Sequence, residues 1–357
     1  MPTVRDIARA AGVSPATVSR VLTGKGNTSS EVNEKVQKAI RELGYVPSPK
    51  AKPHAKDAVS RTICYTIARE PSEIFGNPYY SNVLLGLSNA TQKYGYDLQI
   101  SAFRSVDQQI EKCLSLYRNK KVDGFILSGV MSADKSSLIQ TLQQHSIPFV
   151  MIGRSLQHNI FCIHSDNFRD GYVTAQHLLD QGYRRIAFLT ESLDVDVVRD
   201  RIGGYKQALH SSGLEAGDDG VVLCGSDEAD MIAALDEYSS GGSSFDAIIA
   251  ADSVLALGVL KYCRDRNLRV PEDVGIIGFN DAAFLNKISP SISCTTIRGE
   301  HLGLEALEML IELMDDPERI NQNKTVTLPS ELIVRQSTQR RGESFAQEFA
   351  RFCRRQR

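Results

Sequence analysis

The stretch Thr3–Leu22, TVRDIARAAGVSPATVSRVL, constrains the fold of this chain more than any other segment. It predicts two short helices around a tight turn. Thr3 is expected to be the N-cap of the first helix, with Asp6 completing a shortened capping box. Gly12 interrupts the apolar pattern, and the Ser-Pro pair that follows is the start signal of a second helix. The pattern predicts a helix-turn-helix that reads DNA, and the alternative is an ordinary helical hairpin.

A third helix and an uneven charge distribution favour the first interpretation. An amphipathic helix is expected from about Ser30 to Leu43, with Gly44 as its C-cap, so three helices can close one small core. Residues 1–62 contain eleven Lys and Arg against five Asp and Glu, a balance of +6. The whole chain carries −2, so the remaining residues carry −8. A basic head on an acidic body is the electrostatic pattern of a nucleic-acid-binding protein.

The head resembles the DNA-binding domain of the lactose-repressor/galactose-repressor (LacI/GalR) family. The resemblance rests on the motif AGVS-x-x-TVSRVL within Thr3–Leu22, on Ser30, Lys35 and Val36, and on LGYVP at 43–47. It implies that double-stranded operator DNA is the partner. It also implies DNA contacts at Thr3, Ser14, Pro15, Ala16, Thr17, Ser19 and Arg20. Of these, Pro15, Ala16 and Arg20 would face base edges, and the others would contact phosphates.

A basic linker follows the head, PSPKAKPHAKDAVSR from Pro47 to Arg61. Its prolines predict a semi-stiff spacer. The family has a hinge helix here that inserts a Leu into the minor groove, but Pro53 and His54 stand at the positions of Ser and that Leu. A proline inside a helix costs about 3 kcal/mol, so we do not expect the usual kinking of DNA. Lys50 and Lys52 are expected to neutralise phosphates.

From Thr62 onward, short apolar runs alternate with amphipathic helical stretches. Strands are expected at 62–68, 97–103, 124–128, 148–152, 186–190, 221–224, 247–250 and 275–279. Helices are expected near 79–94, 107–119, 135–145, 168–181, 197–212, 227–238 and 253–267. Nearly continuous apolar strands separated by helices predict buried parallel sheets. About 275 residues exceed what one such sheet needs, so two doubly wound lobes are predicted.

The predicted fold class is therefore α/β, with a small all-α helix-turn-helix head and a two-lobed, periplasmic-binding-protein-like core. The expected boundaries are 2–46 for the head, 47–61 for the hinge, 62–338 for the core and 339–357 for a basic tail. Lobe 1 is expected to contain 62–158 and 292–323, and lobe 2 to contain 159–291 and 324–338. The segments 166–189 and 270–281 (VPEDVGIIGFND) resemble core landmarks of the family.

The cleft between two such lobes, at the carboxyl ends of the strands, is the expected small-molecule site. A carbohydrate needs aromatic faces for its C–H surfaces and charged or amide groups for its hydroxyls. The candidates at strand-to-helix corners are Tyr79, Tyr80, Arg154, Arg201, Asp252, Asn280 and Asp281. Arg201, in RIGGY, resembles the effector-binding arginine of the family. The alternatives are core packing for the tyrosines, a solvated charge for Arg154 and a helix cap for Asp281.

Other features exclude several classes of protein. No P-loop, GxSxG or HExxH motif is present, and no His has metal-ligand spacing, so no enzyme, metal site or cofactor is expected. Seven cysteines, odd in number and never in a CxxC pair, argue against disulfides and for a reducing compartment. The N-terminus begins directly with a polar helix, and no run is long enough to span a membrane, so a cytoplasmic protein is expected.

These observations predict a sequence-specific transcriptional regulator, most simply a repressor, that acts as a homodimer on a palindromic operator. A carbohydrate-type effector is expected to bind between the lobes, and the NPYY loop at 77–80 and the Gly153-Arg154 pair resemble maltose-type regulators of the family. Inducer and corepressor action both stay open. The alternatives are a sugar-binding transport component without DNA function and an enzyme that uses the cleft. The tail, with Phe at 345, 349 and 352, is either an interaction helix or a frayed terminus.

Overall fold

The computed structural model describes residues 3–23, 29–43, 60–131, 134–155, 158–214, 220–225, 227–240 and 244–340. The chain divides into two units, Met1–Val59 and Ser60–Arg357. The expected hinge up to residue 59, with Lys50, Lys52, Pro53 and His54, lies outside the described residues, as does the tail from 341. None of the described helices is long and apolar enough to cross a membrane.

The N-terminal unit contains the three predicted helices, α1 (Val4–Ala11), α2 (Pro15–Thr23) and α3 (Ser30–Glu42). The capping box is present, because the Thr3 side chain accepts from the backbone of Asp6 and the Asp6 carboxylate accepts from the Thr3 backbone. Gly12 ends α1 at a φ of 66°, the left-handed conformation that glycine adopts without strain. The small core contains Ile7, Ala8, Ala11, Val18, Val36 and Ala39.

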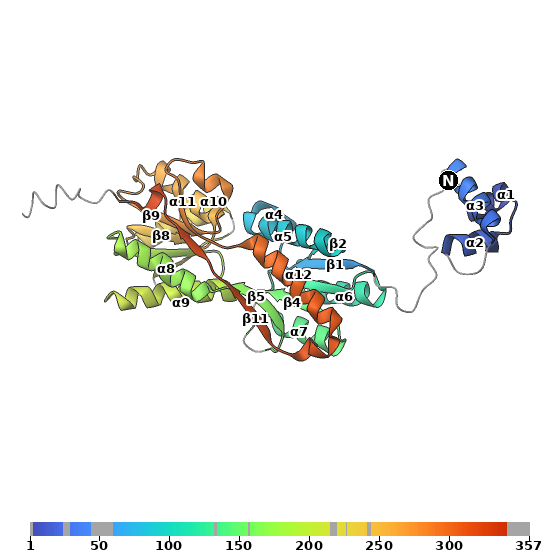
Figure 1. Ribbon diagram of the computed structural model, residues 1–357. Helices are drawn as coiled ribbons and strands as arrows, with labels where there is room; N and C mark the ends of the chain where they lie inside the picture. Colours follow the sequence, from blue (N-terminus) through green and yellow to red (C-terminus); the bar gives the residue numbers. More distant parts are fainter. Residues whose placement is uncertain are drawn as a thin grey trace, which may run out of the picture. The chain divides into compact units, whose positions relative to one another are not determined.

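The second unit is built on two six-stranded sheets (Figure 1). The first has the order β11-β5-β4-β3-β1-β2, and the second has the matching order β12-β10-β9-β8-β6-β7. All pairs are parallel except β10 with β12. The strands of the first sheet are β1 (Thr62–Ile67), β2 (Asp97–Ala102), β3 (Gly124–Ser128), β4 (Phe149–Ile152), β5 (Phe161–Ser165) and β11 (Lys324–Leu328). Those of the second are β6 (Ile186–Thr190), β7 (Val221–Leu223), β8 (Ala247–Ala250), β9 (Gly275–Phe279), β10 (Ser293–Thr296) and β12 (Glu331–Ile333).

Helices cover both faces of each sheet. The first lobe has α4 (Pro71–Gly76), α5 (Pro78–Tyr94), α6 (Val106–Arg118), α7 (Lys135–Gln144), α12 (Gly299–Asp315) and η4 (Pro317–Asn321). The second has α8 (Asn167–Asp180), α9 (Asp196–Ser211), α10 (Glu228–Ser240), α11 (Ser253–Asp265), η3 (Ala283–Asn286) and η5 (Gln336–Thr338). Side chains alternate across β1, so that Ile63 and Tyr65 join one core cluster and Cys64 joins another. This two-sided burial explains the continuous apolar runs in the sequence.

The strand pairing corrects the predicted lobe boundaries. Residues 161–165 were assigned to lobe 2, but they form β5 and pair with β4 in the first sheet. The strand 293–296 was assigned to lobe 1, but it pairs with β9 in the second sheet. Residues 324–328 were assigned to lobe 2, but they pair with β5 in the first. The chain therefore crosses between lobes after 165, after 296 and after 328. Within the last region, α12 in lobe 1 and β12 in lobe 2 lie where they were predicted.

Candidate functional site

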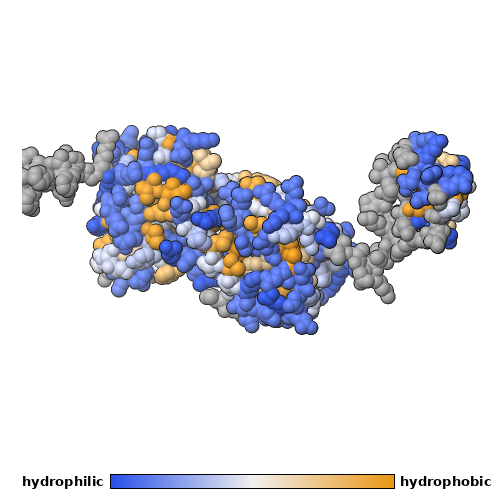
Figure 2. Space-filling model, in the orientation of Figure 1, coloured by the Kyte–Doolittle hydropathy of each residue, from blue (hydrophilic) through white to orange (hydrophobic). Residues whose placement is uncertain are grey.

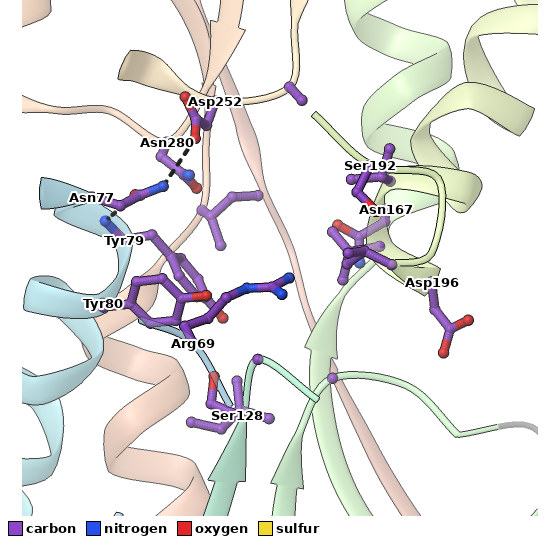
Figure 3. A pocket seen from close by; sticks show the side chains of 18 of the residues that line it. Arg69, Asn77, Tyr79, Tyr80, Ser128, Asn167, Ser192, Asp196, Asp252 and Asn280 are labelled. Atoms are coloured by element: carbon purple, nitrogen blue, oxygen red, sulfur yellow. Dashed lines mark hydrogen bonds between the residues drawn. The ribbon is translucent and has the colours of Figure 1, made fainter. Parts of the chain in front are cut away.

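A cavity of about 660 Å³ lies between the two lobes and is lined by residues of both (Figure 3). This volume is within the range of small-molecule sites, about 300–1,000 Å³. The lining follows the carboxyl ends of the parallel strands, where loops from both sheets meet. Five of the seven predicted contact residues line it: Tyr79, Tyr80, Arg201, Asp252 and Asn280.

Arg201 is the central charged group of the cavity wall. Only 6% of it is exposed, and one guanidinium nitrogen donates to the carbonyl of Ala251 at 3.1 Å. The guanidinium lies 4.1 Å from the centroid of the Phe279 ring, and its Nε has no hydrogen-bond partner. Burial lowers the pKa of Arg201 to about 10, so the side chain is still a cation at neutral pH. A buried cation with an unpaired N–H donor can form a charge-assisted hydrogen bond with an oxygen atom of a ligand.

Arg201 reaches this position because α8 and α9 cross very closely. A Cβ atom on Gly171 would lie 2.0 Å from the carbonyl oxygen of Arg201, and one on Gly204 would lie 1.9 Å from that of Phe168. Only glycine allows these backbone contacts. Figure 1 shows the two helices side by side in the second lobe. The RIGGY segment thus combines a polar contact residue with a glycine needed for helix packing.

Asn77 and Asp252 connect the two lobes. Asn77 caps α5 by accepting from the Tyr79 amide at 3.0 Å, and Asp252 caps α11 by accepting from Val254 and Leu255, both at 2.8 Å. The Asn77 amide also donates to the Asp252 carboxylate at 2.9 Å, as drawn in Figure 3. Burial raises the pKa of Asp252, which the two backbone donors and Arg201 oppose. The positive N-terminal ends of two helices therefore face the cavity.

Tyr79 and Tyr80 form the aromatic part of the wall. Their rings lie 5.2 Å apart between centroids in an edge-to-face arrangement. Tyr80 is 9% exposed and belongs to the core of the first lobe, so the core-packing alternative is also true for this residue. Burial raises the pKa of Tyr79 well above its ordinary value, which keeps the hydroxyl neutral. The pair offers an apolar face with hydroxyls at its edge.

Asn280 follows β9 and is 8% exposed, and its Oδ1 has no partner. Its φ is 68°, a left-handed conformation that Asn adopts more readily than most residues. The backbone amide of Asn280 donates to the Thr295 carbonyl at 3.0 Å. Leaving a buried acceptor unpaired costs about 1–3 kcal/mol. A polar ligand in the cavity could form the hydrogen bonds that Asn280 Oδ1 and Arg201 Nε lack.

Two predicted contact residues lie outside the cavity lining. The guanidinium of Arg154 contacts the Asp200 carboxylate of the other lobe at 2.6 Å, so it is neither a cavity residue nor a solvated charge. The carboxylate of Asp281 accepts from Arg335 at 2.8 and 3.0 Å. It caps no helix, since η3 has no side-chain cap. Neither residue lines the cavity, and each side chain is held in an ion pair instead.

Several lining residues were not predicted. Arg69 follows β1, and Figure 3 shows its side chain reaching toward the middle of the cavity. Asn167, 4% exposed at the start of α8, and Ser192, after β6, line the opposite wall. Lys135 of α7 lines the cavity and contacts Asp196 of α9. The same strand-end criterion could have found Arg69 and Ser192, whereas Asn167 follows β5, a strand the sequence pattern did not reveal.

Most of the predicted DNA-contacting residues of the head lie on α2 or just before it, whereas Thr3 is the N-cap of α1. Ser14, Pro15, Ala16 and Arg20 are exposed, and Thr17 is half-buried. Ser14 caps the helix, because its Oγ accepts from the Thr17 amide at 3.1 Å. Val18 is fully buried and fixes which face of the helix is outward. An exposed, polar helix start with an arginine one turn later is the composition of a recognition helix.

A helix-turn-helix head joined to a two-lobed core with an interlobe cavity defines the class of DNA-binding regulators with a ligand-binding core. The sequence model of bacterial regulatory proteins of the lacI family matches residues 3–48. The model of the periplasmic binding protein-like domain matches residues 175–338. The chain belongs to the LacI family, and it is a DNA-binding transcriptional regulator rather than an enzyme.

Similar proteins support this assignment along almost the whole chain. CelR of Thermobifida fusca, an HTH-type transcriptional regulator, is 29% identical over 343 residues, which cover 94% of this chain and 98% of CelR. MalR of Streptococcus pneumoniae, another HTH-type transcriptional regulator, is 28% identical and covers 90% of this chain and 95% of its own. The structure of a CelR-cellobiose complex has a TM-score of 0.72 at 28% identity, covering 94% of this chain and all of that one.

Proposed function

We propose that this protein is a repressor whose affinity for operator DNA is set by a neutral carbohydrate bound in the interlobe cavity. The observation that carries the proposal is the buried, incompletely hydrogen-bonded pair of Arg201 Nε and Asn280 Oδ1 beside the tyrosine rings. A donor and an acceptor beside an aromatic face suit a sugar, whose hydroxyls both accept and donate. The similar solved structures include a CelR-cellobiose complex and a probable maltose operon transcriptional repressor, so these two disaccharides are the first probes.

The charges of the cavity wall support a neutral ligand. The cations Arg69, Lys135 and Arg201 are balanced by carboxylates that also line the cavity, namely Glu70, Glu191, Asp196 and Asp252. Lys135 and Asp196 pair with each other. A strongly anionic or cationic ligand would meet like charges on one side, and this arrangement disfavours it.

The sugar site is tested by thermal shift and calorimetry of the full chain with cellobiose, maltose and their monosaccharides. At least one sugar is expected to stabilise the wild type, and Arg201→Ala is expected to abolish that stabilisation. Arg269→Ala is the matched control, because Arg269 lies in the same lobe, is exposed and forms an ion pair with Asp273 on the surface. Binding that survives in Arg201→Ala would refute the site, and the absence of any carbohydrate ligand would refute the class of effector.

A homodimer is proposed because both lobes expose apolar side chains at equivalent edges. In the first lobe these are Leu85 of α5 and Ile100 of the edge strand β2, 50% and 46% exposed. In the second it is Leu223 of the equivalent edge strand β7, 52% exposed. Figure 2 shows apolar patches on the surface of the core. Apolar edge strands favour pairing, and light scattering of Leu85→Asp should show a monomer where the wild type is a dimer.

Within the head, we propose that Arg20 reads a base edge and that Thr3, Ser14, Thr17 and Ser19 contact phosphates. Two heads on one dimer would read a palindromic operator. Replacing Arg20 with Ala should remove roughly 1–3 kcal/mol of sequence discrimination. Replacing Lys50 or Lys52 should weaken all duplexes alike and reduce the salt dependence. The transport alternative is not retained, because the lacI model matches the head.

A further inference from the structure

The conformation of Asn280 needs support from outside the cavity. The residue follows β9 with a left-handed φ of 68°, and its side chain lines the cavity with an unpartnered Oδ1. Its carbonyl accepts from the Ala282 amide at 2.9 Å, which makes a tight turn. Neither the left-handed backbone nor the unpaired acceptor is favourable by itself, so the surrounding structure must determine this geometry.

Arg335 provides that support from the opposite side of the turn. Asn280 lines the cavity, whereas Asp281, the next residue of the turn, does not. One Nη of Arg335 donates to both carboxylate oxygens of Asp281, at 2.8 and 3.0 Å. The Arg335 side chain is only 12% exposed, where an ion pair is screened little by solvent.

Arg335 is itself held at both ends. Its backbone amide donates to the Ser293 hydroxyl at 2.8 Å, and its second Nη donates to the Ile292 carbonyl at 2.9 Å. Ser293 begins β10, the strand beside β9. The guanidinium therefore ties the turn after β9 to the start of β10. Residues 292–295 also hold Asn280 directly, through the carbonyl of Thr295.

We propose that Arg335 is a positioning residue of the effector site. It fixes Asp281, and through Asp281 it fixes the turn that presents Asn280 to the ligand, although Arg335 does not line the cavity. The ligand part of this inference rests on the proposed function, whereas the structural part does not. Specificity at Asn280 is thus set partly by a residue that lies beyond β12, some 55 positions along the chain.

Hydrogen exchange of the full chain tests the structural part without any ligand. In Arg335→Gln, the Asn280 and Ala282 amides are expected to exchange at least tenfold faster, while the β8 amides at 247–250 keep the wild-type rate. Asp281→Asn is expected to give the same local change, and the double variant is expected to be no worse than either single one. Arg269→Gln, which breaks an exposed ion pair of the same lobe, is the matched control.

The outcomes separate the two levels of the inference. Unchanged exchange at Asn280 and Ala282 would overturn it, and so would equally faster exchange throughout the second lobe, because Arg335 would then be a general stabilising residue. A sugar that binds the wild type is expected to bind Arg335→Gln at least tenfold more weakly, and binding at wild-type strength would also overturn the inference. If neither cellobiose nor maltose binds the wild type, the exchange result alone decides the role of Arg335, and the proposed effector class fails separately.

Discussion

At the scale of single residues, the cavity wall combines groups that are satisfied by the protein with groups that are not. Asp252 accepts from two backbone amides and from Asn77. Arg201 Nε and Asn280 Oδ1 have no protein partner. The first kind of group fixes the geometry of the site, and the second kind is available to a ligand. The unsatisfied groups reduce stability and are therefore expected where binding occurs.

Asp170 gives a pH-dependent prediction at this scale. This α8 carboxylate is 4% exposed and accepts from the Ser330 hydroxyl at 2.9 Å. Burial raises its pKa from 3.8 to about 6. The folded state therefore holds this proton more tightly than the unfolded chain. Asp170 therefore does not reduce the free energy of unfolding below pH 3.8. As the pH rises from 3.8 to 6, that free energy falls by about 3 kcal/mol.

The Asp170→Asn variant keeps an oxygen that can accept from Ser330 and removes the buried charge. It is expected to be more stable than the wild type at pH 7.5 and to lose less stability between pH 4 and pH 6. Denaturant unfolding at several pH values measures both effects. Asp180→Asn, at the exposed end of the same helix, is the control. Equal pH dependence in wild type and Asp170→Asn would show that Asp170 is not the titrating group.

The sequence predicted only some of the strand-end residues that line the cavity. Tyr79, Arg201, Asp252 and Asn280 were correctly placed at corners near the cleft. The position of a residue after a strand does not reveal the direction of its side chain. Asn280 and Asp281 are neighbours, yet only the first lines the cavity, because Arg335 holds the second. Such distant partners have no local signal in one sequence.

At the scale of helices and strands, glycine determines where Arg201 lies. The neighbouring residues Gly203 and Gly204 of α9 form a natural comparison. A Cβ at 204 would meet the Phe168 carbonyl oxygen at 1.9 Å, whereas one at 203 would meet only the Phe168 ring, at 3.3 Å. A backbone cannot move aside without separating α8 from α9, while a ring at the end of a side chain can.

Gly204→Ala is therefore expected to destabilise the core by about 1–3 kcal/mol, as overpacking commonly does. Gly203→Ala is expected to be neutral or stabilising, because alanine favours a helix by up to about 1 kcal/mol over glycine. Urea unfolding of both variants checks the difference. Equal stability of the two variants would mean that the α8–α9 crossing tolerates a side chain at 204.

The helices and most strands could be predicted from periodicity and caps, but the sheet to which some strands belong could not. An alternation of strands and helices predicts a doubly wound fold. The three crossings between the lobes were predicted, but each was placed one strand too early. β5 follows β4 without an intervening helix, so the expected alternation broke there. The segments 293–296 and 324–328 were also misassigned, because the last strand before a crossing has no local signal that tells to which sheet it belongs.

At the scale of the whole core, contacts between described side chains of the two lobes hold the lobes together. Asn77 meets Asp252, Lys135 meets Asp196, and Arg154 meets Asp200. Both acidic partners of the last two pairs lie in the first turns of α9, the helix that also carries Arg201. These contacts stabilise the lobe arrangement seen here, and a ligand shifts the equilibrium between arrangements only by its unequal affinity for them.

Replacing Asp196 and Asp200 with Asn is expected to open the cleft. The distance between spin labels at 111 and 264, exposed positions on α6 and α11, can be measured by double electron–electron resonance. The described cysteines are buried, so Cys353→Ser provides a background for labelling. In the Asp196 and Asp200 variant, the distance distribution should broaden toward longer values. The control variant, in which the exposed pair Arg269–Asp273 is replaced by Gln and Asn, should have the wild-type distribution. An identical distribution in the Asp196 and Asp200 variant would argue against these ties.

The central claim is that occupancy of the interlobe cavity changes the affinity of the head for its DNA. Duplexes selected from a random pool by the full chain supply the operator, and its affinity is measured with and without the sugar that stabilises the wild type. We predict a change of roughly 5–150-fold, the usual range of allosteric coupling. Arg201→Ala should bind the duplex as the ligand-free wild type does and lose the response. Equal DNA affinity at saturating sugar, or an unaltered response in Arg201→Ala, would contradict the claim.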